Sequence, residues 1–95
     1  QSNIDVINAE YGYLANAVLT KKSNIFIGDK NFEYFIGSYE KKENGISYKV
    51  DERILIYELE KEGRLIIKIN AYDNKVTDEM LNELTKFSYE NKKYK

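Results

Sequence analysis

The stretch that decides the fold is residues 53–72, which reads RILIYELEKEGRLIIKINAY. Apolar residues recur at every second position in both halves, which is typical of β-strands whose two faces meet different surroundings. Lys61-Glu62-Gly63 interrupts this alternation with a polar turn. We therefore predict a β-hairpin with strands at 53–60 and 64–72. Its core-facing side chains are expected to be Leu55, Tyr57, Leu59, Leu65, Ile67 and Ile69.

Three shorter runs upstream of the hairpin are rich in β-branched and aromatic residues. The runs at 25–27, 32–39 and 46–50 are bounded by polar or glycine-containing turns, and each is predicted to form a strand. Asp51-Glu52 is expected to form a bulge or a tight corner before the next strand, and Gly37 a bulge within one. Consecutive hairpins of this kind predict an antiparallel meander.

The amino-terminal segment has a helical pattern instead of an alternating one. Its apolar residues at helical spacing are Ile4, Ile7, Tyr11, Leu14 and Val18. This spacing predicts one amphipathic helix over about residues 4–20. We expect its apolar stripe to pack on the core-facing side of the 53–72 hairpin.

The carboxy-terminal segment fits two patterns. Residues 77–84 are predicted to form a short helix with Thr77 as its cap, and residues 85–91 a final strand. The alternative is a helix that continues to Phe87, because that residue also fits the helical spacing. The fold class expected from the whole pattern is α+β, with the amino-terminal helix packed on an antiparallel meander of four to five strands.

Length and charge indicate one globular domain. The chain has 95 residues, which is the size of a single domain. Residues 1–3 resemble a remnant of cloning, so residues 4–95 are taken as the domain and the natural protein is expected to continue upstream. The net charge is −1, with 15 basic and 16 acidic residues, so no large field favours nucleic acid or a membrane surface.

The composition argues against an enzyme. The sequence contains no Cys and no His, which removes the thiolate nucleophile and the commonest general base. Glu58, Glu60 and Glu62 are expected on an outward strand face, where carboxylates are solvated. The glycines do not form a phosphate-binding loop. We predict a non-enzymatic protein without a cofactor.

One acidic loop is a candidate metal site. Its oxygen-bearing residues are Asp73, Asn74, Asp78 and Glu79. Oxygen ligands of this type suit calcium. The alternative interpretation is a solvated loop followed by a helix start, since acidic residues also favour the first turn of a helix.

Aromatic residues interleaved with lysine raise a second binding hypothesis. The chain has nine Tyr and four Phe, and near the carboxy terminus these alternate with lysines, as in single-stranded nucleic-acid binders. Aromatic residues are also good strand formers and suit protein interfaces. Because the net charge is near zero, we expect protein partners and no nucleic acid.

Three segments resemble minor type IV pilins and pseudopilins: ISYKV at 46–50, IYELEKEGRLIIK at 56–68 and LNELTKFSY at 81–89. The resemblance implies a pilin-like subunit of a surface filament or of a secretion or competence apparatus. It also implies that the opening helix is the soluble half of a longer helix whose upstream half anchors in the membrane. The cysteine pair of many pilins is absent.

The first functional hypothesis is therefore a structural subunit at the cell surface, anchored in the membrane only through an upstream helix. The composition, rich in Lys, Asn, Ile and Tyr and poor in Arg, indicates a low-GC Gram-positive source. The alternative is a free-standing protein-binding or regulatory module, located in the cytoplasm, that recognises its partner by a sheet edge or face.

Overall fold

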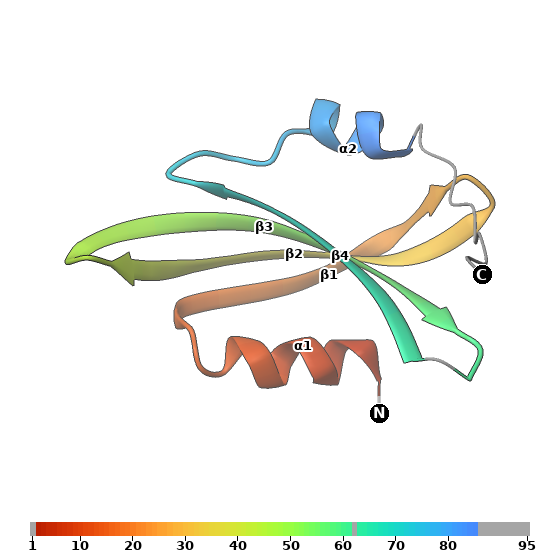
Figure 1. Cartoon of the computed structure of the whole chain (residues 1–95), viewed down its shortest axis with the longest axis horizontal. Helices are drawn as coiled ribbons and strands as arrows, with labels where there is room; N and C mark the ends of the chain where they lie inside the picture. Colours follow the sequence, from red (N-terminus) through yellow and green to blue (C-terminus); the bar gives the residue numbers. More distant parts are fainter. Residues whose placement is uncertain (1, 62, 86–95) are drawn as a thin grey trace, which may run out of the picture.

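The alternating segments form a four-stranded antiparallel sheet that lies between two short helices (Figure 1). The computed structural model describes residues 2–61 and 63–85. Its elements are α1 (Asn3–Tyr11), β1 (Ala15–Ile27), β2 (Lys30–Glu43), β3 (Ile46–Leu59), β4 (Gly63–Tyr72) and α2 (Asp78–Thr85). The strand order is β1-β2-β3-β4. The α+β class and the antiparallel meander are confirmed. The carboxy-terminal strand expected at 85–91 falls almost entirely outside the described residues.

Two-residue turns join the first three strands. Asn44 and Gly45 both have positive φ, 51° and 79°, as a type I′ turn requires. Gly28 also has a positive φ, 61°, and starts the turn between β1 and β2. Turns of this kind match the twist of the strands that they join, so the sequence itself sets the register of both hairpins.

β3 is one long strand, not two strands separated by a corner. Asp51 pairs with Ser38 and Glu52 with Gly37, without any shift of register. The bulge or corner expected at Asp51-Glu52 is therefore wrong, and so is the bulge expected at Gly37. The charged pair is tolerated inside a strand because its two side chains point to opposite faces, and each finds partners there.

The helix expected over residues 4–20 ends at Tyr11. Gly12 follows it as the C-cap, and glycine is unfavourable within a helix. Residues 15–20 belong instead to β1, where Val18 pairs with Ser38 of β2. The side chains of Leu14 and Val18 are 36% and 61% exposed, so neither contributes to the predicted helix–sheet packing.

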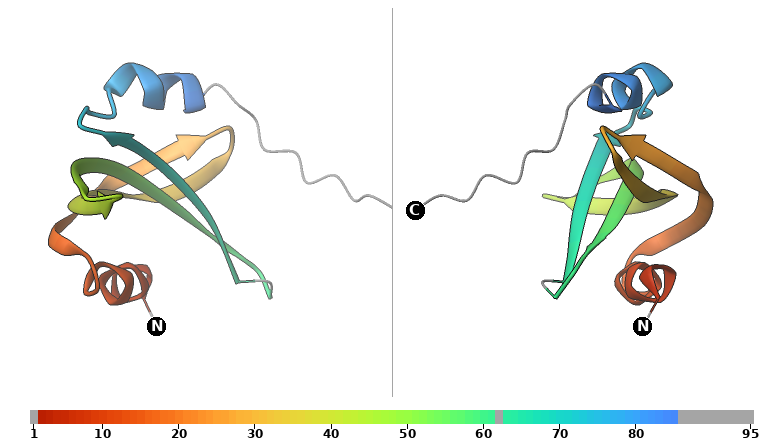
Figure 2. Two further views of the ribbon diagram at one scale, coloured as in Figure 1. Left: turned by 60° about the vertical axis from the view of Figure 1, so that its left-hand side comes forward. Right: turned by 90° about the vertical axis from the view of Figure 1, so that its right-hand side faces the viewer.

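Each face of the sheet packs against one helix (Figure 2). On the α1 face, the buried core consists of Ile7, Tyr11, Phe35, Ile54 and Ile56, with Ile4 packed against it. On the α2 face, it consists of Ile27, Phe32 and Leu55, flanked by Ile25, Tyr57, Leu65, Ile67 and Leu84. The sheet therefore separates two small cores.

The helix α1 lies on the opposite side of the hairpin from the one predicted. Ile4, Ile7 and Tyr11 do form its packing stripe, as expected. They meet Ile54 and Ile56 instead of the row that begins with Leu55, which faces α2. The reason lies in β3, where three successive residues, 54–56, are all buried. A strand buried on both faces carries no alternation that identifies the side of a particular helix.

Tyr11 joins α1 to the centre of the sheet. Its hydroxyl donates a hydrogen bond to the Glu52 carboxylate, with 3.0 Å between Oη and Oε1. The other Glu52 oxygen accepts from Asn70 at 3.2 Å. The tyrosine ring lies over Gly37, where a Cβ atom would overlap the ring and the hydroxyl. Gly37 is therefore needed for close approach of a side chain, as glycines within strands often are.

Burial disfavours ionisation of the Tyr11 hydroxyl in this contact. Tyr11 is 6% exposed and Glu52 is 4% exposed. Desolvation, reinforced by the adjacent Glu52 carboxylate, raises the pKa of Tyr11 well above the ordinary value of a tyrosine. Desolvation and the same carboxylate also raise the pKa of Tyr39, whose ring meets the Tyr11 ring edge-on. The folded state therefore holds the Tyr11 phenol neutral.

The first prediction concerns Gly37. We expect Gly37→Ala to lower the free energy of unfolding by about 1–3 kcal/mol, because the methyl group overpacks against Tyr11. Gly12→Ala is the matched control, since a Cβ there meets only ordinary contacts and the backbone is right-handed helical. Guanidinium denaturation compares the two variants. Equal stability of the two would contradict the close approach of Tyr11.

The second prediction concerns alkaline pH. Because the folded pKa of Tyr11 lies above the unfolded one, its stabilising contribution is complete below about pH 10 and falls as the pH rises beyond that value. Tyr11→Phe should be less stable at pH 8 by about 1–3 kcal/mol, since Glu52 loses a buried partner. We expect the gap between wild type and variant to narrow above about pH 10. Tyr13→Phe, at an exposed tyrosine, should show neither effect, and a constant gap would refute this linkage.

Candidate functional site

The segment after β4 is held on the sheet by two charged side chains of β3. Asp51 accepts hydrogen bonds from Arg53 at 2.7 Å and from the Val76 amide at 2.8 Å. Arg53 also donates to the Val76 carbonyl at 3.3 Å. The two side chains therefore bind both polar backbone groups of Val76, whose own side chain is buried. This contact brings the chain across the α2 face and positions α2.

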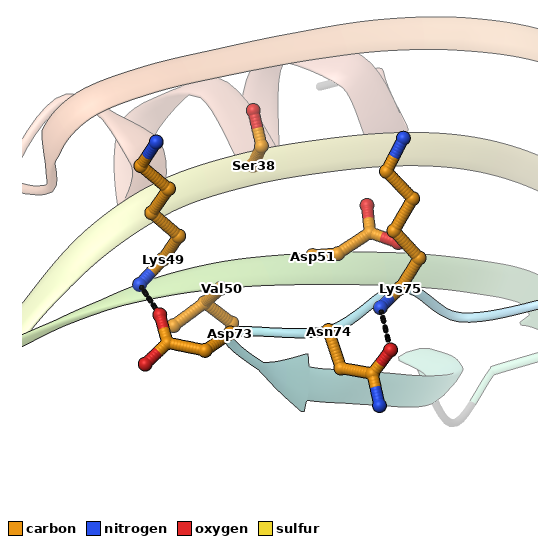
Figure 3. A pocket seen from close by; sticks show the side chains of 7 residues that line it. All are labelled: Ser38, Lys49, Val50, Asp51, Asp73, Asn74 and Lys75. Carbon is orange, nitrogen blue, oxygen red and sulfur yellow. Dashed lines mark hydrogen bonds between the residues drawn. The ribbon is translucent and has the colours of Figure 1, made fainter.

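The crossing of this segment leaves an open pocket of about 380 Å³ between it and strands β2 and β3 (Figure 3). Its lining residues are Ser38, Lys49, Val50, Asp51, Asp73, Asn74 and Lys75. Figure 3 shows the side chains of Lys49 and Lys75 on either side of Ser38. A smaller hollow of about 140 Å³ adjoins it and shares Ser38, Lys49 and Val50.

The polar groups of the pocket serve mainly to hold the chain. Asp51 is engaged by Arg53 and Val76, while Asp73 accepts from the Lys49 backbone amide at 2.9 Å. Within residues 2–61 and 63–85, no side chain forms a hydrogen bond with the Ser38 hydroxyl. The pocket therefore presents no paired nucleophile and base in the part of the chain that the structure describes.

The four predicted metal ligands lie in two separate places along the chain. Asp73 and Asn74 lie in the crossing segment, where each side chain accepts a hydrogen bond from a backbone amide. Asp78 and Glu79 occupy the first turn of α2, and Thr77 accepts from the Met80 amide as the predicted cap. No cluster of three acidic side chains suited to a metal ion occurs among the described residues. The alternative interpretation, a solvated loop and a helix start, fits this arrangement.

The sheet has two edges, and β1 is the protected one. Its pairing with β2 shifts register twice, between Ala15 and Val18 and again between Lys21 and Asn24. Bulges and lysines are two devices by which natural sheets discourage pairing with another chain. Both helices also lie close to the backbone of β1.

The other edge, β4, has no shift of register, and its two cations are directed to α1. It runs for ten residues and pairs with β3 from Gly63 to Tyr72 without any shift of register. In the described part of the chain, no strand lies on its outer side. Both helices approach the backbone of β1 more closely than that of β4. Within residues 2–61 and 63–85, no strand pairs with the backbone groups of this outer edge, and an unpaired edge is what strand addition requires.

The side chains of β4 favour such pairing as well. Its α2 face carries a half-buried apolar row formed by Leu65, Ile67, Ile69 and Ala71. On the α1 face, Lys68 forms an ion pair with Glu10 at 2.8 Å, and Arg64 donates a hydrogen bond to Asn3. These two cations are directed to the helix, and Ile66 between them is 39% exposed.

Three of the residues predicted for helix–sheet packing are thus edge residues of β4. Leu65, Ile67 and Ile69 lie in its apolar row, and the first two pack against the α2 core. Leu59 is half-buried at the end of β3. The uninterrupted alternation of residues 64–72 predicts a regular strand. It does not predict that this strand lies at an edge of the sheet.

The third prediction concerns the crossing segment. We expect Asp51→Ala to cost about 1–3 kcal/mol of stability, because Arg53 and the Val76 amide lose their acceptor. Amide exchange at Val76 and Leu81 should accelerate more than exchange in β2, since the loss is local. The control is Glu60→Ala, at an exposed acidic residue beside the last hairpin. Slower or unchanged exchange at Val76 would show that the anchor is unimportant.

Comparisons with known proteins found no relative. A scan against family models, a search of curated proteins and a search of solved structures each returned no match. Among the described residues, neither helix has the length and apolar character that a membrane span requires.

Proposed function

We propose that this chain is a non-enzymatic protein-binding domain that adds a strand of its partner to the outer edge of β4. The observation that carries the proposal is the contrast between the two edges of one sheet. The pairing of β1 with β2 is interrupted twice. β4 pairs with β3 without interruption, and no described strand lies on its outer side. Strand addition supplies affinity through main-chain hydrogen bonds and specificity through alternate side chains.

The apolar row of β4 supports the same proposal. Leu65, Ile67 and Ile69 remain half-buried, so an added strand could cover the rest of their apolar surface. Each fully buried aliphatic side chain contributes roughly 1.5–3 kcal/mol relative to an exposed one. Burial of the remaining exposed surface of these three side chains by an added strand would therefore contribute to the binding free energy.

The proposal follows the second of the two functional hypotheses. The pilin-like hypothesis required one helix over residues 4–20, whereas α1 ends at Tyr11 and residues 15–20 belong to β1. A subunit at the cell surface stays a prediction that none of the comparisons supports. The absence of His and Cys from the sequence and the engaged acids of the pocket support a binding role over catalysis.

The fourth prediction tests strand addition directly. A synthetic peptide with the sequence of residues 63–72 should bind the folded protein, because it repeats the alternation that β4 presents. Hydrogen exchange should show new protection of the amides of β4 and none at residues 18–21 of β1, which serve as the internal control. A scrambled peptide of the same composition should give no protection. Protection confined to β1, or none in β4, would refute the proposal.

A further inference from the structure

We infer that the strand added to β4 is β4 of a second copy of this chain, antiparallel and centred on Ile67. The inference rests on the proposed function, because it names the partner of the same edge. When a two-fold axis relates two antiparallel copies of one strand, the numbers of opposite residues have a constant sum, and the axis passes between the two copies of one residue. The register is therefore defined by that central residue.

The length of the pairing and the positions of the charges select Ile67. A centre at Ile67 pairs residues 63–71 of each copy, which is nearly the whole strand. A centre at Lys68 is equally long but places two lysines opposite each other. A centre at Ile66 pairs Arg64 with Lys68, again like charges, and like charges directly opposite destabilise a sheet. A centre at Ile69 avoids like charges but pairs only residues 66–72.

The register centred on Ile67 matches apolar with apolar on the α2 face. Leu65 of one copy faces Ile69 of the other, on both sides of a central Ile67 pair. These side chains are half-buried in one copy. In the dimer, the apolar row of one β4 would lie beside the apolar row of the other β4. The two apolar rows then form one continuous surface across the joint sheet.

On the α1 face, the same register separates the cations. Lys68 faces Ile66 of the other copy, and Arg64 faces Asn70. The Lys68 ammonium is already bound to Glu10, which reduces its cost near a second strand. The contact is self-complementary and closes as a dimer, because each copy uses the same surface.

The test uses charge at position 66. Ile66 is partly exposed, so both Ile66→Lys and Ile66→Glu should fold, and thermal unfolding checks that they do. In the proposed register each change acts twice, since residue 66 of each copy faces Lys68 of the other. Sedimentation from low micromolar to near-millimolar concentration should show a wild-type dimer. We expect the Ile66→Lys dimer to be weaker than the Ile66→Glu dimer by about tenfold or more, with a smaller difference at high salt.

Each outcome has a defined meaning. A concentration-dependent increase in the protection of β4 amides in the wild type, together with the charge effect, supports the inference. Equal dissociation of the two variants overturns the Ile67 register, and a wild-type monomer at every concentration overturns the second copy. A monomer that still binds the 63–72 peptide at β4 leaves the proposed function standing. Failure of that peptide to protect β4, at concentrations where the chain is a monomer, removes both.

Discussion

The hydrogen bond between Tyr11 and Glu52 is the contact on which the arrangement of the molecule depends. It places the last residue of α1 over Gly37, in the middle of β2, and gives a buried carboxylate a partner. A buried carboxylate that lacks a donor is costly, and a side chain at position 37 would exclude the ring. The helix is short, at nine residues, so its stability depends on tertiary packing more than on its own propensity. Tyr11 supplies that packing together with Ile4 and Ile7.

The sequence predicts the strands better than it predicts what lies on them. Residues 53–72 form the predicted hairpin, because strict alternation and a glycine-containing turn are local signals. Thr77 likewise caps α2 as predicted, since a capping residue acts on amides of its own helix. The face of the sheet that receives α1 is a different problem. Residues 54–56 are buried on both sides of β3, so their pattern does not distinguish the two faces. Gly37 leaves room for Tyr11 on one of them.

The error at residues 15–20 has a similar origin. Leu14 and Val18 extend the helical spacing of Ile7 and Tyr11, yet they are exposed. Gly12 and the positive φ of Asn16, 50°, mark the end of the helix and the bend into β1. The pairing with β2 then decides the conformation, because long-range strand contacts override a weak local preference. The position of β4 at the edge of the sheet could not be predicted either. Alternation indicates which residues of a strand are buried, but not which strand is outermost.

The contacts that hold α1 also explain why β4 is the unprotected edge. Lysine and arginine normally discourage an edge strand from pairing, and β4 contains one of each. Both are drawn to the helix, Lys68 by Glu10 and Arg64 by Asn3. The side chains that stabilise the α1 face are therefore withdrawn from the edge, while the bulges of β1 protect the opposite one. This asymmetry between the two edges is the basis on which we propose β4 as the edge that binds a partner.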